Sequence, residues 1–597
     1  MPSYNAPIRD MKFVLHEVLD ATSQLTSHEK FAEADQELFD AILEEGGKFC
    51  SEVLAPLNAV GDQQGCTRHD DGSVTTPDGF KDAYDTMVQN GWVSLADPVE
   101  YGGQGMPGLL NLAAGEMQSS SNMAFAMYPG LTNGAIKAIL IGGSDEQKQT
   151  FLPKMVEGTW TGTMNLTEPH CGTDLGLLKT KAVPNSDGSY KISGQKIFIS
   201  AGEHDMSDNI IHLVLARVQD APAGVKGISL FIVPKFKLDK DGNPGERNGV
   251  SCGAIEHKMG IHGNSTCVMN YDEAEGYMIG EENKGLRVMF VMMNRARLDV
   301  GMQGMAQSEV AYQNAVIYAR DRIQGRSLTG PKNENGPADP IIVHPDVRRM
   351  LMETKAYNEG ARALIYWAAL MEDLESVHED EKFRERCDDL LGLLTPVIKG
   401  YLTDKAMETT INCQQIFGGH GYIEEWGMSQ FVRDQRIAMI YEGANGIQAL
   451  DLVGRKLARK GGRALMTLQT EVDAYIAEHE GNEKVADFIG GLKDSKAKLQ
   501  EGTMWLMQNG MSNPDNAGAG SVDYMHMMGL TIFAYMWAQM AVVAQAKIDE
   551  GSNDDYYSNK VITGQYFVKR MLPQMDAHLA KLKTGAEPVM ALDAAAF

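Results

Sequence analysis

The chain has 597 residues, a formal net charge of −26 and a pI near 5.0. A chain this long exceeds a single core and predicts three or four domains of ~100–200 residues each. The acidity argues against nucleic acid as a partner, because binding phosphates requires clustered Lys and Arg. The seven cysteines include no C-x-x-C pair, which predicts a reducing, cytoplasmic setting without a disulfide framework or a zinc site.

Residues 1–160 are predicted to form a helical N-terminal domain. Apolar residues at helical spacing predict a helix over 34–55 that stops at Pro56, and later helices include 109–118 and 133–141. Residues 103–108 satisfy G-x-G-x-x-G, but prolines on both sides favour a loop over a dinucleotide-binding turn. The first residues carry Asp and Glu and lack an apolar core, so no secretion signal is expected.

Residues 161–284 are predicted to form a middle β domain. Apolar and polar residues alternate with period two, which predicts strands over 179–183, 190–192, 195–200, 212–216 and 228–233. Asp187-Gly188 and Ser193-Gly194 are interpreted as turns between strands. Several short strands between two helical regions favour a small barrel or two packed sheets.

Helical periodicity returns after Gly285, which predicts a helical bundle domain over 285–458 and an additional helical C-terminal domain over 459–597. The helices are expected at 302–323, 346–371, 390–417, 432–455, 464–478 and 484–508, and residues 510–520 are expected to interrupt the last region. The apolar segment 524–546 contains His526 and Gln539, so we interpret it as a buried helix and expect no integral membrane segment. The predicted fold class is therefore α+β, mainly α.

A candidate catalytic carboxylate stands at Glu442, between the apolar residues 438–440 and a loop at 443–446 that contains two glycines. A carboxylate in such a place can lose hydration, which raises its pKa toward the range of a general base. The alternative is that Glu442 only stabilises the start of the following helix through the helix dipole.

Two longer stretches decide between these interpretations. Residues 415–448 contain Q-I-F-G-G-H-G-Y, then R-D, then I-Y-E-G, and residues 163–174 read T-M-N-L-T-E-P-H-C-G-T-D. The first resembles the C-terminal signature of the acyl-CoA dehydrogenases without a gap, and the second resembles the T-E-P-x-x-G-S-D loop of the same family. The resemblance covers about residues 35–455 and implies the acyl-CoA dehydrogenase fold with FAD as the cofactor.

The resemblance also implies the site. Glu442 corresponds to the base that removes the α-proton of an acyl-CoA thioester, and Arg297 and Gly443 lie beside the substrate. Thr173 lies between substrate and cofactor. The remaining residues implied to contact FAD are Leu166, Thr167, Phe198 and Ser200 of one subunit and Arg322, Gln324, Gln415, Gly418 and Gly419 of its neighbour. Where the family has T-x-Q after E-G, this chain has Ala444-Asn445-Gly446, so two cofactor contacts are expected to be lost or replaced. No metal site is expected.

The two ends of the chain resemble one subgroup of the family. The opening A-P-I-R-D-M-K-F-V-L and the helices after Arg455 resemble a long bacterial subgroup that oxidises 3-(methylthio)propanoyl-CoA to 3-(methylthio)acryloyl-CoA in dimethylsulfoniopropionate catabolism. A medium- or long-chain fatty acyl-CoA dehydrogenase of β-oxidation is the alternative. An acyl-CoA oxidase and an inactive binding or scaffold protein with this fold also remain open. The expected partners are an acyl-CoA, electron-transfer flavoprotein or a similar acceptor, and a second copy of the chain in a homodimer.

Overall fold

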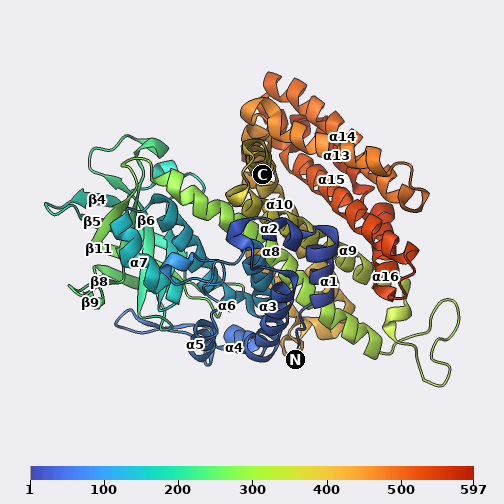
Figure 1. Cartoon of the computed structure of the whole chain (residues 1–597), viewed down its shortest axis with the longest axis horizontal. Coiled ribbons are helices and arrows are strands. Elements are labelled where there is room, and N and C mark those ends of the chain that lie inside the picture. Colours follow the sequence, from blue (N-terminus) through green and yellow to red (C-terminus); the bar gives the residue numbers. More distant parts are fainter. Residues whose placement is uncertain (1) are drawn as a thin grey trace. The chain divides into compact units, whose positions relative to one another are not determined.

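The computed structural model describes residues 2–597, which form two compact units. The helical unit comprises Met1–Glu44 and Val300–Phe597, and the sheet unit comprises Glu45–Asp299. Two helices cross the boundaries, α3 (Gln36–Phe49) and α8 (Gly285–Asp321). Figure 1 labels the elements of both units along the chain.

The sheet unit contains a closed ring of strands, the first of the two arrangements (a small barrel or two packed sheets) that the sequence favoured. Strand β11 pairs with β5, β5 with β4, β4 with β6, β6 with β7, and β7 again with β11. Strand β10 pairs with β11, and β3 extends the sheet beside β6. The bounds are β3 Trp160–Asn165, β4 Lys181–Pro184, β5 Tyr190–Ser200, β6 Asn209–Val218, β7 Ser229–Pro234, β10 Val250–Ile255 and β11 Thr266–Ile279. Two small hairpins accompany the sheet, β1 Thr67–Arg68 with β2 Val74–Thr75 and β8 Phe236–Leu238 with β9 Pro244–Arg247.

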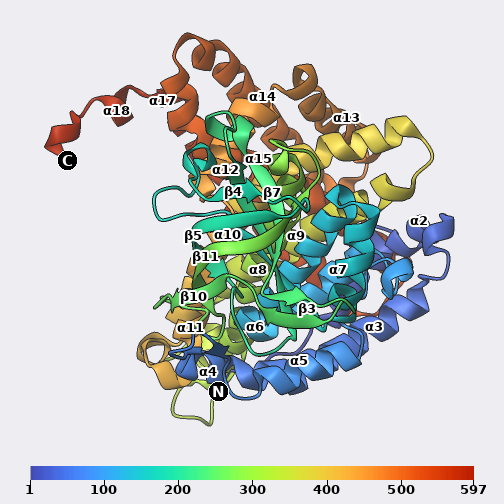
Figure 2. The same cartoon turned by 90° about the vertical axis from the view of Figure 1, so that its left-hand side faces the viewer.

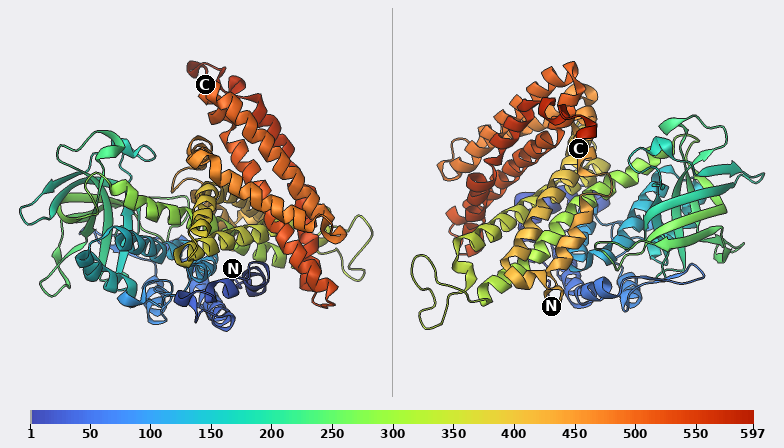
Figure 3. Two further views of the ribbon diagram at one scale, coloured as in Figure 1. Left: turned by 45° about the horizontal axis from the view of Figure 1, so that its top comes forward. Right: turned by 180° about the vertical axis from the view of Figure 1, so that it is seen from behind.

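Helices pack on this sheet and complete its hydrophobic core. The helices of the unit are α4 Ala55–Gln64, α5 Phe80–Gln89, α6 Gly108–Gly142 and α7 Asp145–Glu157. Helices α6 and α7 lie against β3, and their apolar side chains join those of β6 and β7 in one core that contains Ile136, Leu152, Trp160 and Leu213. Figure 3 shows this sheet and its helices from two sides. The core fixes β3, the strand that leads into the T-E-P loop.

The helical unit is built around two long antiparallel neighbours, α9 (Pro345–Val377) and α10 (Glu381–Ile416), which pack along each other. The unit also contains α1 Ile8–Lys12, α2 Ala21–Thr26, α11 Met428–Ala438, α12 Asn445–Asp451, α13 Arg463–His479, α14 Ala486–Ser512, α15 Pro514–Asp549, α16 Asp555–Tyr566, α17 Gln574–Thr584 and α18 Glu587–Met590. Helix α15 packs against α14, α16 and α17 and also contacts α9, α10 and α12. Figure 2 shows α18 and the chain end extending away from α17.

Helix α15 is the one helix of residues 2–597 that is long and apolar enough to cross a membrane, and 83% of its most apolar 18-residue window is buried within the protein. Buried aromatic and sulfur-containing residues along α15, such as Tyr524, Met528, Phe533 and Trp537, fill the space against its neighbours. These contacts are those of a core helix, in agreement with the interpretation of segment 524–546.

Several predicted element ends were wrong. Pro56 does not end a helix: a π-helical turn over Cys50–Leu54 leads into α4, where Pro56 occupies the first turn and needs no N–H donor. Residues 109–118 and 133–141 belong to a single helix, α6, which bends at Asn122 and contains Pro129. Residues 510–520 interrupt the helices only at Asn513.

The six-residue segment 103–108 forms the loop predicted for it. It connects a 3₁₀ turn at Val99–Tyr101 to the start of α6. A Cβ at Gly103 would lie 2.2 Å from the carbonyl oxygen of Asp97. The glycine there serves a close approach between backbone segments and not a phosphate site.

Candidate active site

The loop that carries Glu442 connects α11 to α12 and has a strained backbone. Glu442 has a φ of +57° and Gly443 a φ of +88°. The left-handed region costs an L-residue roughly 1–2 kcal/mol. Non-glycine residues in this region persist only where their surroundings hold them, and they concentrate at functional sites. The backbone therefore supports the assignment of Glu442 as a functional residue.

Buried polar side chains hold the loop. Gln448 Nε2 donates hydrogen bonds to the carbonyl oxygens of Glu442 and Gly443 at 3.1 and 3.0 Å. Lys399 Nζ, on α10, donates to the same Gly443 carbonyl at 2.8 Å. Gln448 and Lys399 are both fully buried, whereas the Glu442 side chain is half-buried. The Tyr441 hydroxyl donates to Gln303 Oε1 on α8. Two consecutive carbonyls are thus fixed by donors shielded from water.

The T-E-P loop follows β3 in the sheet unit and contains the predicted cofactor residues Leu166, Thr167 and Thr173. The Leu166 carbonyl accepts a hydrogen bond from Lys196 Nζ at 3.0 Å, and the Thr167 carbonyl accepts one from the Ile197 N–H at 2.9 Å. The structure therefore brings Leu166 and Thr167 beside β5. Thr173 lies further along the loop and is exposed.

An ion pair with almost no exposure anchors this loop. Lys196 Nζ lies 2.9 Å from Glu168 Oε1, and their side chains are 0% and 3% exposed. The carboxylate also accepts hydrogen bonds from the Lys179 N–H, the Thr180 N–H and the Thr180 hydroxyl at 2.6–3.0 Å. Burial by itself raises the pKa of Glu168, but the Lys196 ammonium and these donors outweigh it and hold the pKa below its usual value.

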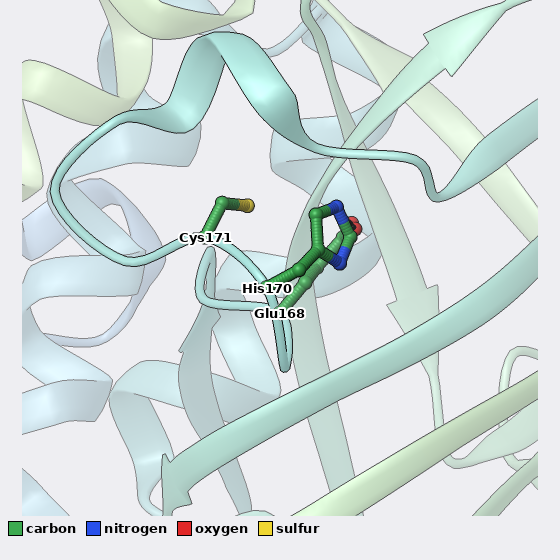
Figure 4. Close-up of side chains that lie close together, drawn as sticks. All are labelled: Glu168, His170 and Cys171. Atoms are coloured by element: carbon green, nitrogen blue, oxygen red, sulfur yellow. Dashed lines mark ion pairs between the residues drawn. The ribbon is translucent and has the colours of Figure 1, made fainter.

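Glu168, His170 and Cys171 form a group of potential metal ligands in the same loop, and their ligand atoms lie within 4.8 Å of one another. Figure 4 shows the three side chains, with His170 close to Glu168. Both carboxylate oxygens already accept hydrogen bonds from their protein donors. We therefore assign this group to the anchoring of the loop.

Phe198 and Ser200 lie at the end of β5 that follows this anchor. The Phe198 ring is 59% exposed, unusual for a large apolar side chain on a central strand, and its φ is +59°. An exposed aromatic face next to a hydroxyl fits a planar heteroaromatic ring with a polar edge. The residues present on this part of the sheet unit thus fit the isoalloxazine of FAD.

Five further predicted cofactor residues lie on the helical unit. Arg322 and Gln324 follow the end of α8, Gln415 lies in the last turn of α10, and Gly418 and Gly419 follow that helix; all five are exposed. Tyr318 brings the two segments together, because its ring stacks on Phe417 at 4.1 Å between centroids and its hydroxyl lies 2.9 Å from His420 Nδ1. A Cβ built at Gly418 or Gly419 would meet nothing within 4 Å, so this surface is open to an approaching group.

Arg297 lies on α8 in the sheet unit and is buried at 7% exposure. The sequence interpretation did not single out Lys196, Glu168, Lys399 or Gln448. A signal for the two lysines is present in the sequence, since Lys196 lies on a predicted strand and Lys399 interrupts the apolar run 397–402. A lysine in an apolar context is rarely buried without a partner.

Asn445, at the variable position between the two departures from the family pattern at Ala444 and Gly446, turns toward α10. Its Nδ2 contacts the Gly400 carbonyl, Thr403 Oγ1 and Asp404 Oδ1 at 3.1, 2.8 and 2.7 Å. Its Oδ1 accepts from Lys399 Nζ at 2.8 Å. The side chain thus belongs to the support of the loop.

Four protein-family models match consecutive parts of the chain. They are described as acyl-CoA dehydrogenase, N-terminal domain (residues 37–159), acyl-CoA dehydrogenase, middle domain (163–274), acyl-CoA dehydrogenase, C-terminal domain (283–457) and acetyl-CoA dehydrogenase C-terminal like (468–593). Together they span most of the chain.

Curated relatives are similar over nearly their whole length. The 3-methylmercaptopropionyl-CoA dehydrogenase of Ruegeria pomeroyi is 43% identical over 97% of this chain and 98% of its own. A butyryl-CoA dehydrogenase of Syntrophomonas wolfei is 35% identical over 97% of each chain. The broad-specificity linear acyl-CoA dehydrogenase FadE5 of Mycobacterium tuberculosis is 34% identical over 100% of each chain.

Solved structures share the fold. Caenorhabditis elegans ACDH-11, in complex with C11-CoA, has a TM-score of 0.80 at 18% identity and covers 99% of this chain and 95% of its own. The butyryl-CoA dehydrogenase of Megasphaera elsdenii has a TM-score of 0.58 at 28% identity and covers 71% of this chain and 98% of its own.

Proposed function

The chain belongs to the acyl-CoA dehydrogenase family of FAD-dependent oxidoreductases, and from this premise we propose that it oxidises 3-(methylthio)propanoyl-CoA to 3-(methylthio)acryloyl-CoA. The observation that carries the substrate is the 43% identity, over nearly the full length of both chains, to the 3-methylmercaptopropionyl-CoA dehydrogenase of Ruegeria pomeroyi. Two further full-length relatives, at 34–35% identity, are named for butyryl or broad linear acyl chains.

The mechanism that we propose begins at Glu442. Its carboxylate removes the α-proton of the thioester, and the strained loop aims it because Gln448 and Lys399 hold the carbonyls of residues 442 and 443. The α-proton is a weak acid, so negative charge that develops on the thioester oxygen needs hydrogen-bond donors. By family resemblance one of these is the Glu442 backbone N–H, and such preorganised donors contribute about 3 kcal/mol each.

The cofactor is FAD, and we propose that Leu166, Thr167, Thr173, Phe198 and Ser200 of one subunit and Arg322, Gln324, Gln415, Gly418 and Gly419 of a second subunit hold it. When bound, FAD accepts the hydride that leaves the β-carbon. The Arg322 guanidinium suits a pyrophosphate because it offers paired donors. Thr173, Arg297 and Gly443 would contact the substrate.

We propose a homodimer that meets through this open surface of the helical unit. Large apolar side chains near it are exposed to solvent, namely Ile317 (54%), Ile323 (39%), Ile411 (46%), Tyr422 (85%) and Ile423 (48%). Exposed apolar side chains that gather beside polar ones are typical of a surface that a partner covers. The expected electron acceptor is electron-transfer flavoprotein, and the expected location is the cytoplasm.

The first test is anaerobic bleaching of the flavin by four thioesters: 3-(methylthio)propanoyl-, butanoyl-, octanoyl- and hexadecanoyl-CoA. We expect the methylthio substrate to reduce the flavin with the highest kcat/KM. Preference for octanoyl-CoA or a longer chain would instead place the enzyme in fatty-acid β-oxidation. Release of hydrogen peroxide without an added acceptor would identify an oxidase.

The second test is Glu442→Gln, which keeps the side-chain shape and removes the base. We expect the variant to retain FAD and to lose flavin reduction by a factor of about 10²–10⁴, the usual contribution of a general base. Glu480→Gln, at an exposed glutamate next to α13, is the control and should react like the wild type. Reduction at the wild-type rate in Glu442→Gln would contradict the assignment of the base.

A further inference from the structure

The support of the Glu442 loop does not end at α10. Asn445 Nδ2 lies 2.7 Å from Asp404 Oδ1, and the other oxygen of the same carboxylate, Oδ2, lies 2.9 Å from His526 Nε2. A carboxylate accepts hydrogen bonds, so both nitrogens donate to it. His526 lies on α15, in the part of the chain matched by the acetyl-CoA dehydrogenase C-terminal-like model. A continuous series of hydrogen bonds thus connects α15 to the loop of the catalytic glutamate.

The contact between α15 and α10 is close and well packed at this point. The Tyr401 ring meets the His526 ring edge-on at 5.4 Å between centroids. Three residues along α15, a Cβ at Gly529 would lie 2.3 Å from the Tyr401 ring, so only glycine permits this approach. The Asp404 and His526 side chains are 17% and 8% exposed. Water therefore competes little for the hydrogen bond between them.

We propose that His526 and Asp404 are positioning residues for the catalytic base, so that the C-terminal helices complete the active-site loop. This inference rests on the proposed role of Glu442. Asn445 Oδ1 accepts a hydrogen bond from Lys399 Nζ, and Asn445 Nδ2 donates one to Asp404 Oδ1. Lys399 Nζ also donates to the Gly443 carbonyl. His526 thereby fixes Asp404, Asp404 fixes Asn445, and Asn445 fixes the turn that keeps Glu442 in its strained conformation.

The inference also gives a role to Asn445, the middle residue of segment 444–446. An asparagine can donate and accept through one planar amide, and the side-chain hydrogen bonds of Asn445 are with α10. A side chain without that amide could not join Lys399 to Asp404.

The same helices offer a matched control. His578 Nδ1, on α17, lies 2.7 Å from Asp523 Oδ1 on α15, and these side chains are 14% and 16% exposed. This second His–Asp pair resembles the first in chemistry and burial. Its hydrogen bonds and ion pairs stay within α15 and α17 and do not include the loop, although its ring packs against the His526 ring at 5.1 Å between centroids.

The experiment uses the FAD-loaded, full-length enzyme and compares His526→Leu, His526→Gln, Asp404→Asn and His578→Leu. The readouts are the anaerobic rate of flavin reduction at saturating substrate, the substrate Kd, the melting temperature, and the isotope effect with substrate deuterated at the α-carbon. A displacement of a catalytic group by about 1 Å can cost about 100-fold in rate. We expect His526→Leu and Asp404→Asn to slow reduction by about 10- to 100-fold with little change in Kd.

The isotope effect should increase in these two variants, because proton removal then limits the rate more fully. His526→Gln should recover most of the rate, since the Gln amide can donate to Asp404 from the position of Nε2. His578→Leu should reduce the flavin at the wild-type rate even if its melting temperature falls.

Wild-type reduction rates in both His526→Leu and Asp404→Asn would overturn the proposal. So would an equal loss in His578→Leu, because the effect would then be a general loosening of the C-terminal helices. Glu442→Gln in the same assay separates the role of Glu442 as the base from the role of His526 in positioning it. If Glu442→Gln reacts normally, the assignment of the base is wrong. If it is inactive and the His526 variants react like the wild type, only the positioning role is wrong.

Discussion

The buried Glu168–Lys196 pair allows a quantitative test of how the predicted flavin loop is held. In Lys196→Met the carboxylate stays in place with 3% exposure and loses its ammonium partner, while the donors from Lys179 and Thr180 remain. Removal of one member of a buried ion pair usually costs about 3–5 kcal/mol. Because three donors remain, we expect a value near the lower limit, about 3 kcal/mol of unfolding free energy.

The loss of unfolding free energy in Lys196→Met should depend on pH. In the wild type the pKa of Glu168 lies below its ordinary value of 4.5, so its stabilising contribution is present above pH 4.5 and is lost as the pH falls through the folded-state pKa. In Lys196→Met the ammonium no longer offsets the burial of Glu168, so the pKa of that carboxyl group should rise above 4.5. Protonation of Glu168 in acid then removes the cost of burying its unpaired charge. The difference in stability between variant and wild type should therefore be largest near pH 7 and should shrink below about pH 5.

The assay is denaturant unfolding and thermal melting of the FAD-loaded protein at pH 7 and pH 5. For a unit of about 250 residues, 3 kcal/mol corresponds to a decrease in melting temperature of about 6–12 °C. Lys191→Met is the matched control on the same strand, because its pair with Glu273 is exposed (45% and 64%) and should contribute less than about 1 kcal/mol.

The double variant Lys196→Met/Glu168→Gln should recover most of the lost stability, because no unpaired charge then remains buried. FAD content should fall in Lys196→Met, since the Leu166 carbonyl also loses its donor. A variant that melts within 1 °C of the wild type at pH 7, or a double variant no more stable than the single, would refute the argument.

Two other buried groups give further predictions. Asp97 is 8% exposed, its Oδ2 has no hydrogen-bond partner within residues 2–597, and burial raises its pKa from 3.8 to about 7. The folded state therefore keeps a proton that the unfolded state loses, so the free energy of unfolding should decrease as the pH rises from about 4 to about 7. In Asp97→Asn this pH dependence should disappear. The variant should be more stable than the wild type by at most about 4 kcal/mol at pH 8, as measured by denaturant unfolding. Lys560 is buried between Asp10 on α1 and Glu359 on α9, so Lys560→Met should cost about 3–5 kcal/mol in the same measurement, whereas Lys569→Met, at an exposed pair with Asp487, should change little.

The sequence predicted a middle β domain and the surrounding helices, because period-two and helical spacings are local properties, but it left a small barrel and two packed sheets as alternatives. It was wrong at Ser193-Gly194, where β5 runs without a turn. A Cβ at Gly194 would lie 2.6 Å from Thr180 Oγ1, so this glycine allows the close approach of β4 and β5. The same applies to Gly520, where a Cβ would lie 2.3 Å from Leu582. A glycine required by a distant neighbour and a glycine required by a turn look alike in a single sequence.

In the candidate site, too, contacts between residues far apart in the chain could not be predicted from the sequence. Motif spacing located Glu442 and the T-E-P loop, since a family signature is itself local in sequence. It could not show what holds them, because Lys196, Lys399 and His526 act through partners far away along the chain. Two of them share a detectable property, however: Lys399 and His526 are each a polar or basic residue within a segment that is otherwise apolar, whereas Lys196 follows Gln195 on a strand with several polar residues. Burying such a group without a partner costs several kcal/mol, so its presence in a core segment requires a partner in the fold.

This requirement changes how departures from a family pattern should be interpreted. The loss of T-x-Q at 444–446 predicted weaker contact with the cofactor and kept an inactive scaffold open. In the structure the residue between these two departures, Asn445, instead supports the loop through α10 and its neighbour α15. A short dehydrogenase without α15 would lack His526, and its loop would need support from elsewhere. The amide at position 445 and His526 should therefore act together, so that loss of either one should leave the Glu442 loop less firmly held.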